Sequence, residues 1–232
     1  MKKFLLIFAV TSAMFTASAQ EVIFEEEFEA GIPTTWLNVD ADGDQYVWES
    51  SILSANNSFF GHQGDDGCVF SNSFVNYFGA LNPDNWLITP QIALGEGCTL
   101  KYYVAGQDPN YASEHYGVYV SETGTDTGDF AEVMTETLPN GTRDFYERTV
   151  DLSNFAGKNV YIAFRHFDIS DMYILKLDGI SITSQGEPSA VNDIETAEKT
   201  SNVWVDLQGR KFDQKPEAAG IYINNGKKVI IK

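Results

Sequence analysis

Short apolar runs separated by turn residues recur along the middle of the 232-residue chain. In several runs apolar and polar residues alternate, which places Leu100, Tyr102 and Val104 on one face of an extended strand. No longer window carries an apolar stripe with helical spacing. The pattern predicts strands at residues 22–28, 46–52, 68–74, 86–92, 99–105, 116–121, 145–152, 160–167 and 173–183.

The composition favours two packed sheets. Aromatic residues make up 13% of the chain, and 19 glycines accompany the short strands. Short strands with frequent turn signals are typical of β-sandwiches, in which two antiparallel sheets enclose one core. We therefore predict an all-β protein with a β-sandwich at residues 20–184.

The first 19 residues have the pattern of a secretory signal peptide. Lys2 and Lys3 precede an apolar run at residues 4–10, and Ala17-Ser18-Ala19 is a small-residue cleavage site. A single membrane helix is the alternative, but this run is too short to cross a bilayer. We predict Sec-dependent export, no membrane span, and a secreted or outer-surface location.

The C-terminal region differs from the rest in charge. Residues 201–232 hold six Lys/Arg and three Asp/Glu, whereas residues 20–200 hold seven Lys/Arg and 30 Asp/Glu. A turn-rich linker at 185–200 separates the two regions. Within the tail, an Asn-Asn-Gly turn between apolar runs predicts a β-hairpin. We expect a small separate β tail at 201–232.

The net charge of −18 excludes some partners. A strongly acidic body repels nucleic acid and anionic lipid, so neither is expected to bind, and the same charge favours cations. The two cysteines, Cys68 and Cys98, are compatible with one disulfide or with two free thiols.

The clearest candidate metal ligands lie in the turn Asp40-Ala-Asp42-Gly-Asp44. Alternate carboxylates can direct several hard oxygens at one ion, as calcium requires. The turn is not an EF-hand, because its glycine comes too early and no flanking helices are predicted. A solvated acidic turn is the alternative.

Further carboxylates lie in the first and last predicted strands. Alternation directs Glu26 toward the core and Glu25 and Glu27 away from it, and places Asp178 on the same face as Ile180 and Ile182. An inward carboxylate needs a partner. We predict a structural Ca²⁺ whose ligands come from Glu25, Glu26, Glu27, Asp40, Asp42 and Asp178.

The predicted loop at residues 108–114 is a second, weaker calcium candidate. Asp108, Asn110 and Glu114 supply oxygen atoms there, although a turn held by Asx-type hydrogen bonds explains the same residues. The spacing of the histidines fits no compact zinc motif, and we expect His115 and His166 to be hydrogen-bonded sheet residues.

Aromatic side chains are the candidates for ligand binding, because their faces stack on the C–H faces of sugar rings. We select Tyr111, Tyr116, Phe145 and Tyr146, with a core position as the alternative for each. For Phe59, Phe60, Tyr77 and Phe78 the sequence leaves ligand binding and a place as core or turn anchors equally open. No nucleophile motif is present, although spacing alone does not exclude a glycosidase built on two carboxylates.

Three stretches give the chain a family resemblance: Asn82-Pro-Asp-Asn-Trp-Leu-Ile-Thr-Pro90, residues 105–120, and Tyr161-Ile-Ala-Phe-Arg-His-Phe-Asp168. They closely resemble the cleaved-adhesin (haemagglutinin) domains that accompany the gingipain proteases of anaerobic Bacteroidetes. The resemblance covers residues 23–184 and implies a jelly-roll sandwich. The matching family motif reads Leu-Asp-Asp where this chain has Gly179 at the third position.

The resemblance also implies a function. The leading hypothesis is a non-catalytic adhesin domain that binds host or matrix glycoprotein, or a haem protein. The alternatives are a carbohydrate-binding module that captures polysaccharide and a hydrolase of unknown substrate. The tail, with Leu207-Gln-Gly-Arg210 and Gly226-Lys-Lys-Val229, resembles the C-terminal sorting domain of type IX secretion. A structural hairpin is the alternative for the tail.

Overall fold

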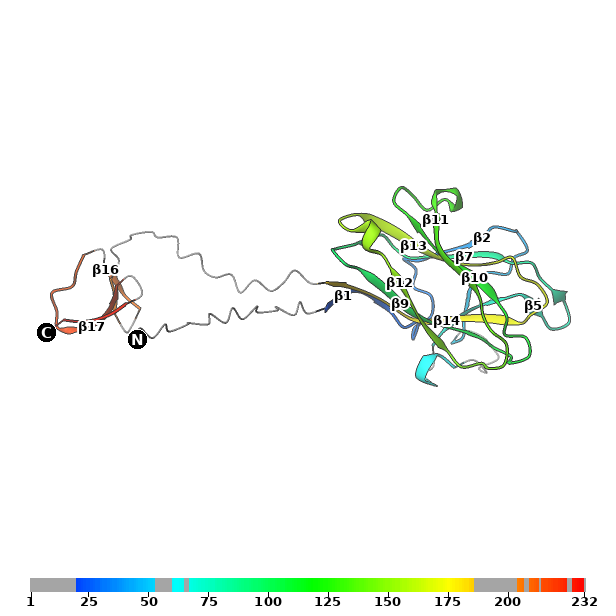
Figure 1. Cartoon of the computed structure of the whole chain (residues 1–232), viewed down its shortest axis with the longest axis horizontal. Helices are drawn as coiled ribbons and strands as arrows, with labels where there is room; N and C mark the ends of the chain where they lie inside the picture. The colour runs from blue at the N-terminus through cyan, green and yellow to red at the C-terminus, as the bar shows by residue number, and fades with distance from the viewer. Residues whose placement is uncertain are drawn as a thin grey trace, which may run out of the picture. The chain divides into compact units, whose positions relative to one another are not determined.

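The computed structural model describes residues 20–52, 60–64, 67–185, 204–206, 209–212, 214–224 and 227–231. The chain divides into two compact units, residues 1–188 and 189–232 (Figure 1). The predicted signal peptide and nearly all of the predicted linker lie outside the described residues. Within the described part of the chain, no helix is long and apolar enough to cross a membrane.

Each predicted strand overlaps an observed one. Two longer strands were missed, β2 (Leu37–Asp40) and β11 (Ala131–Thr137), and both end the strand order of their sheet. Edge strands of this kind are half exposed, so their apolar alternation is weak. The remaining elements of the larger unit are β1 (Gln20–Glu26), β3 (Glu49–Ser50), η1 (His62–Gly64), β4 (Val69–Asn72), β5 (Phe74–Val75), β6 (Gly79–Ala80), β7 (Asp84–Ile88), β8 (Ile92–Ala93), β9 (Thr99–Gly106), β10 (His115–Ser121), η2 (Thr127–Asp129), β12 (Tyr146–Asp151), η3 (Ser153–Phe155), β13 (Asn159–Phe167) and β14 (Ile174–Gln185).

These strands form two antiparallel sheets, which confirms the predicted all-β sandwich. One sheet has the order β12-β9-β14-β4-β3, with β1 also paired to β14. The other has the order β11-β10-β13-β7-β2, with β8 also paired to β13. The chain passes from one sheet to the other from β9 to β10, from β12 to β13 and from β13 to β14. Residues distant in sequence therefore meet across the core.

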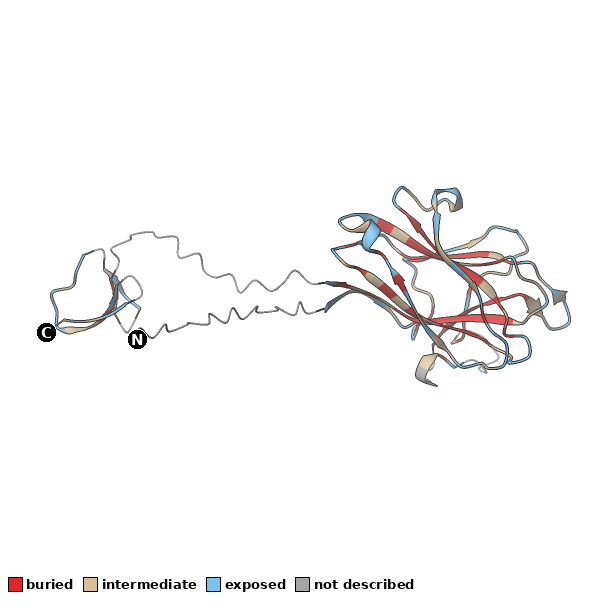
Figure 2. Cartoon of the chain, viewed as in Figure 1, coloured by how far each residue is buried: buried red, intermediate tan, exposed pale blue. Residues whose placement is uncertain are grey.

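The core lies between the facing sides of the two sheets (Figure 2). The alternation of β9 is confirmed, because Leu100, Tyr102 and Val104 are all fully buried. Tyr102 packs its ring edge against Phe164 of the opposite sheet, with ring centroids 5.1 Å apart. Burial of such large side chains is the main favourable term for a sandwich of this size.

The structure contradicts the prediction that Asp178 lies on the core face of its strand. The pairing of β14 with β9 is interrupted by a β-bulge between Asp178 and Ser181. Leu177 before the bulge and Ile180 after it both face the core, so the alternation changes parity at Gly179. Asp178 therefore lies on the outer face of its sheet, and the predicted face shared with Ile180 is wrong.

Gly179 is required at this bulge for two reasons. Its φ of +56° lies in the left-handed region, and a Cβ placed there would lie 2.6 Å from the Tyr103 ring. We expect Gly179→Ala to lower the free energy of unfolding by about 2–3 kcal/mol, through backbone strain and overpacking. Gly128→Ala is the matched control, because nothing lies within 4 Å of its added Cβ. Equal urea midpoints for the two variants would contradict this account of the bulge.

Cys68 and Cys98 are both buried, and the disulfide that the sequence left open does not join them. Burial raises the pKa of the Cys98 thiol, and its Sγ donates a hydrogen bond to the Gly95 carbonyl at 3.4 Å. Both cysteines act as small apolar core residues.

The smaller unit is a four-stranded sheet in the order β16-β15-β17-β18. The predicted hairpin is its β17–β18 pair, and two short strands not predicted complete the sheet. Trp204 and Tyr222 are its buried aromatic residues, with ring centroids 6.4 Å apart. The strands are β15 (Trp204–Asp206), β16 (Lys211–Phe212), β17 (Gly220–Asn224) and β18 (Lys227–Ile231).

Candidate ligand-binding surface and metal sites

The three stretches that carry the family resemblance meet in one sheet. β13 pairs with β7 on one side and with β10 on the other. On the outer face of this sheet, Arg165 forms a two-point ion pair with Asp84, at 2.7 and 2.9 Å, which raises the pKa of its guanidinium. The same guanidinium lies 4.2 Å from the Phe167 ring centroid and 4.8 Å from the Trp86 ring. These residues stabilise the sheet through ion pairing and cation–π contact.

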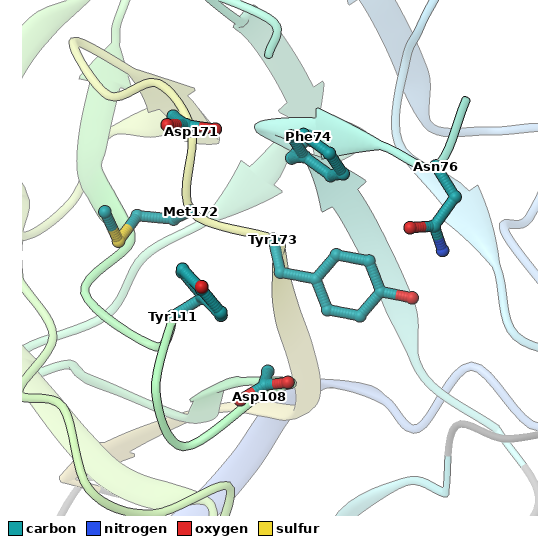
Figure 3. Close-up of a pocket in the computed structure, with 7 residues that line it drawn as sticks. All are labelled: Phe74, Asn76, Asp108, Tyr111, Asp171, Met172 and Tyr173. Carbon is teal, nitrogen blue, oxygen red and sulfur yellow. The ribbon is translucent and has the colours of Figure 1, made fainter. Parts of the chain in front are cut away.

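An open pocket of about 430 Å³ lies where β5, the β9–β10 loop and the start of β14 meet. Figure 3 shows aromatic rings from all three segments in its wall. Tyr111, one of the predicted ligand residues, is 52% exposed there. Carboxylate and amide side chains stand beside the rings. The lining residues are Phe74, Asn76, Asp108, Tyr111, Asp171, Met172 and Tyr173.

A second depression of about 370 Å³ adjoins the first, because Phe74, Asn76 and Tyr173 line both. The tip of the β5–β6 hairpin carries Tyr77, whose side chain is fully exposed, and Phe78, which is 80% exposed. Large apolar side chains so exposed indicate an interaction surface. We call Tyr46, Phe74, Tyr77, Phe78, Tyr111 and Tyr173 the aromatic surface.

For Tyr77 and Phe78 the sequence left ligand binding and a place as core or turn anchors equally open. They do occupy a turn, but neither is buried, and Tyr77 adopts a φ of 72°, which non-glycine residues rarely adopt. The ring centroids of Phe78 and Tyr46 are 6.4 Å apart. Two adjacent aromatic residues before a glycine were the available sequence signal for an exposed hairpin tip.

The prediction that Tyr116 is a ligand-binding platform is wrong. Tyr116 is 1% exposed, and its hydroxyl donates to Glu136 at 2.6 Å. Burial is also the main reason that the pKa of its phenol is raised. Its side chain is on the core face of β10, where alternation directs it inward. Tyr116 is therefore a core residue in this structure.

The other two predicted ligand residues lie away from the aromatic surface. Tyr146 is half-buried, packs against the core and has the Arg148 guanidinium 5.0 Å from its ring centroid. Phe145 is half-buried and lines a separate pocket together with Lys176. Of the four predicted ligand residues, the structure brings only Tyr111 to the aromatic surface.

The Asp40 turn brings three carboxylates together. Oxygen atoms of Asp40, Asp42 and Asp44 lie within 4.8 Å of one another. Among the described residues, these three form the one cluster of at least three His, Cys, Asp or Glu side chains close enough to share a metal ion. Burial works to raise the pKa of Asp40, but hydrogen bonds from the Gln45 and Gly43 amides outweigh it and lower that pKa. Burial and repulsion from Asp44 raise the pKa of Asp42.

Asp178 and the first-strand glutamates lie in the other sheet. Asp178 is fully buried, and its carboxylate accepts hydrogen bonds from the His62 and Gly179 amides at 2.5 and 2.8 Å. Glu27 approaches the same place, because its Oε2 would lie 3.6 Å from a Cβ at Gly179. Glu25 is exposed, and Glu26 accepts a hydrogen bond from the Phe28 amide at 2.9 Å. The structure thus divides the predicted ligands into two clusters.

The three residues of the second calcium candidate, Asp108, Asn110 and Glu114, do not come together in the structure. Asp108 accepts hydrogen bonds from the Asn110 amide at 2.8 Å and from its side chain at 3.3 Å, which is the Asx-type turn named as the alternative. Glu114 turns inward instead. Its Oε1 accepts from the Ser73 hydroxyl at 3.0 Å and from the Tyr173 amide at 2.8 Å.

Glu114 belongs to a buried network that joins the two sheets. Its Oε2 lies 3.1 Å from His166 Nε2, and His166 Nδ1 lies 2.8 Å from the Ser71 hydroxyl. Asn85 donates to the same hydroxyl at 3.0 Å. The composition is that of a Ser–His–Glu catalytic triad, but Ser71, His166 and Glu114 are all 0% exposed. All three side chains are closed off from solvent in this structure, and their hydrogen bonds link the two sheets.

The expectation that His115 and His166 are hydrogen-bonded sheet residues is confirmed. His115 Nδ1 lies 2.8 Å from the Thr137 hydroxyl of the neighbouring strand, and His166 is held as described above. His62 stacks on Tyr103 with ring centroids 3.4 Å apart.

Comparison with known proteins gives a consistent result. The Cleaved Adhesin Domain family profile matches residues 21–182. Hemagglutinin A of Porphyromonas gingivalis is 43% identical over 188 residues, which cover 75% of this chain and 7% of the relative. Lys-gingipain W83 of the same species is 43% identical over 188 residues, covering 75% of this chain and 11% of the relative. The chain therefore spans about a tenth or less of the length of these relatives.

A solved structure agrees with the sequence matches. The K3 Cleaved Adhesin Domain of Lys-gingipain from Porphyromonas gingivalis W83 superposes with a TM-score of 0.64 at 42% identity. The match covers 72% of this chain and 99% of the K3 domain.

Proposed function

This chain belongs to the cleaved adhesin domain family, and from that membership we propose that it is a secreted or cell-surface, non-catalytic adhesin domain that binds glycans on host or matrix glycoproteins. The observation that carries the proposal is the aromatic surface. Its rings come from the β2–β3 segment, β5, the β5–β6 turn, the β9–β10 loop and the residue just before β14.

The chemistry of this surface suits sugars. The exposed ring of Tyr111 and the half-buried rings of Tyr173 and Phe74 offer flat apolar faces for the C–H side of a pyranose. Asp108, Asn76 and Asp171 stand beside them and can accept or donate hydrogen bonds to hydroxyl groups. An open aromatic pocket with a few convergent polar groups is the usual form of such a binding site.

Calcium is part of the proposal as a structural ion. The Asp40 turn supplies carboxylate oxygens from Asp40, Asp42 and Asp44, and the hard-oxygen chemistry fits Ca²⁺. Glu27 and Asp178 are proposed ligands of a separate site at the β14 bulge. In both places the ion would offset repulsion between neighbouring carboxylates and fix a loop against a strand.

A carbohydrate-binding module for free polysaccharide is the second candidate, because the same surface would serve it. A glycan array probed beside a panel of immobilised host and matrix glycoproteins, with haem proteins included, separates the two. We expect binding to glycoproteins that disappears after enzymatic deglycosylation. Binding confined to free polysaccharides would favour the second candidate, and binding that survives deglycosylation would exclude both.

We propose that the C-terminal unit directs export instead of binding ligand. The support is its sequence resemblance to a sorting domain and its basic charge beside an acidic body. Residues 191–232 fused to a periplasmic reporter, in a host with type IX secretion, should bring the reporter to the cell surface. A reporter that stays in the periplasm would show that this unit has another role.

A further inference from the structure

A pocket of about 400 Å³ separate from the aromatic surface lies on the outer face of the β14 sheet. Its wall combines aromatic and cationic side chains from η1, the end of β9, the segment before β12, and β14 itself. The polar, charged and aromatic residues of its lining are Phe60, His62, Gln107, Arg143, Asp144, Phe145 and Lys176.

Lys176 is the unusual member of this pocket. It alternates with Leu175 and Leu177, which face the core, so it lies on the outer face of β14. It is only 4% exposed, yet it lines the pocket, and its ammonium lies 4.6 Å from the Phe145 ring centroid. Across the described part of the chain, this ammonium has no ion pair within 4.0 Å and no hydrogen bond.

A lysine in this position carries an energetic cost. Burying an ammonium without a partner carries a desolvation penalty, and a cation–π contact offsets only part of it. The nearby carboxylates accept hydrogen bonds from other groups. Asp178 accepts from the His62 and Gly179 amides, and Asp144, which also lines the pocket, accepts from the Thr142 hydroxyl at 2.7 Å. Both carboxylates attract the ammonium from a distance, but burial outweighs this attraction and lowers the pKa of Lys176. An anion in the pocket would supply the missing partner.

We propose that this pocket binds the carboxylate of an acidic sugar, a sialic or uronic acid. Lys176 would pair with the carboxylate, and Phe145, which stands 6.0 Å from His62 in an edge-on arrangement, would offer an apolar wall to the sugar ring. Arg143 and Gln107 at the margin would contact hydroxyl groups. One buried ammonium beside an aromatic ring suits a monoanionic ring compound better than phosphate, which favours several converging donors.

The site concerns a ligand class that the aromatic surface does not select for. The lining of the 430 Å³ pocket on that surface has two carboxylates and no cation, whereas this pocket has Lys176 and Arg143 beside the single carboxylate of Asp144. The two proposals therefore fail separately. Loss of neutral-glycan binding in aromatic-surface variants tests the proposed function, whereas discrimination between acidic and neutral sugars tests this pocket.

Isothermal titration of residues 20–232 with N-acetylneuraminic acid, glucuronic acid, galactose and inorganic phosphate measures the selectivity. Lys176→Met removes the charge but keeps an unbranched side chain beside Phe145, and should weaken acidic-sugar binding about tenfold or more. Lys158→Met is the matched control. Lys158 also lies over a ring, Phe155 at 5.7 Å, but it is exposed and paired with Glu122 at 2.8 Å.

Arg143→Gln, at an exposed position, provides a second variant if Lys176→Met does not fold, and should weaken acidic-sugar binding severalfold. The proposal is overturned if the unaltered chain binds galactose as tightly as the acidic sugars. It is also overturned if phosphate is the preferred anion, or if neither variant changes the affinity.

Discussion

Replacing Glu114 with alanine is expected to lower the free energy of unfolding by about 3–5 kcal/mol, because it removes the centre of a buried network. The carboxylate serves three partners in the core: the Ser73 hydroxyl, the Tyr173 amide and His166. All would be left without an acceptor where water does not reach, and an unpaired buried polar group costs more than a made hydrogen bond contributes. Urea unfolding monitored by tryptophan fluorescence measures the change.

The control is Glu122→Ala, which breaks an ion pair of similar length on the surface. Glu122 and Lys158 are 2.8 Å apart, with 44% of each side chain exposed. An exposed pair of this kind contributes about 0–1 kcal/mol. If Glu114→Ala costs no more than Glu122→Ala, the buried network does not hold the two sheets together as described.

Removal of calcium is expected to lower the melting temperature by several degrees. An ion present at 100 times its dissociation constant adds about 2.7 kcal/mol of stability, and for a domain of this size each kcal/mol corresponds to about 2–4 °C. Added calcium should restore the melting temperature after chelation. Magnesium should do so poorly, because it gives up its water ligands reluctantly.

Two substitutions separate the proposed calcium sites. Asp42→Asn alters the Asp40 turn and Asp178→Asn alters the bulge, and each should shrink the calcium-dependent shift, whereas the exposed Asp129→Asn should leave it unchanged. The comparison uses the difference with and without calcium, since Asp178→Asn also affects hydrogen bonds to His62 and Gly179. If chelation leaves the melting temperature unchanged, the acidic clusters are simply solvated and hold no calcium.

Alternation predicted the interior of this sandwich well, because burial on one face of a strand imposes a strict period of two. It failed where the backbone departs from that period. Gly179 inserts a bulge, so Asp178 turns outward while Ile180 returns to the core. A single extra residue reverses the faces of everything after it, and the sequence gives no more than a glycine as a signal.

The candidate sites were less predictable, since they depend on contacts between distant residues. The Asp40 turn is local, and its three carboxylates converge as their spacing suggested. His166 and Ser71 are 95 positions apart and meet only because the chain crosses between sheets. Tyr111 and Tyr116 are five positions apart in sequence, yet one is exposed in a loop and the other is buried in a strand.

Surface plasmon resonance on immobilised glycoprotein tests most directly whether the domain binds glycoprotein glycans through its aromatic surface. Residues 20–232 are compared with Tyr111→Ala and Tyr173→Ala, and with Tyr161→Ala on the opposite sheet as control. Loss of an aromatic anchor should raise the dissociation constant about tenfold in each surface variant and leave it unchanged in the control. Equal affinities for all four proteins, on glycoprotein that loses binding when deglycosylated, would contradict the aromatic surface as the binding site.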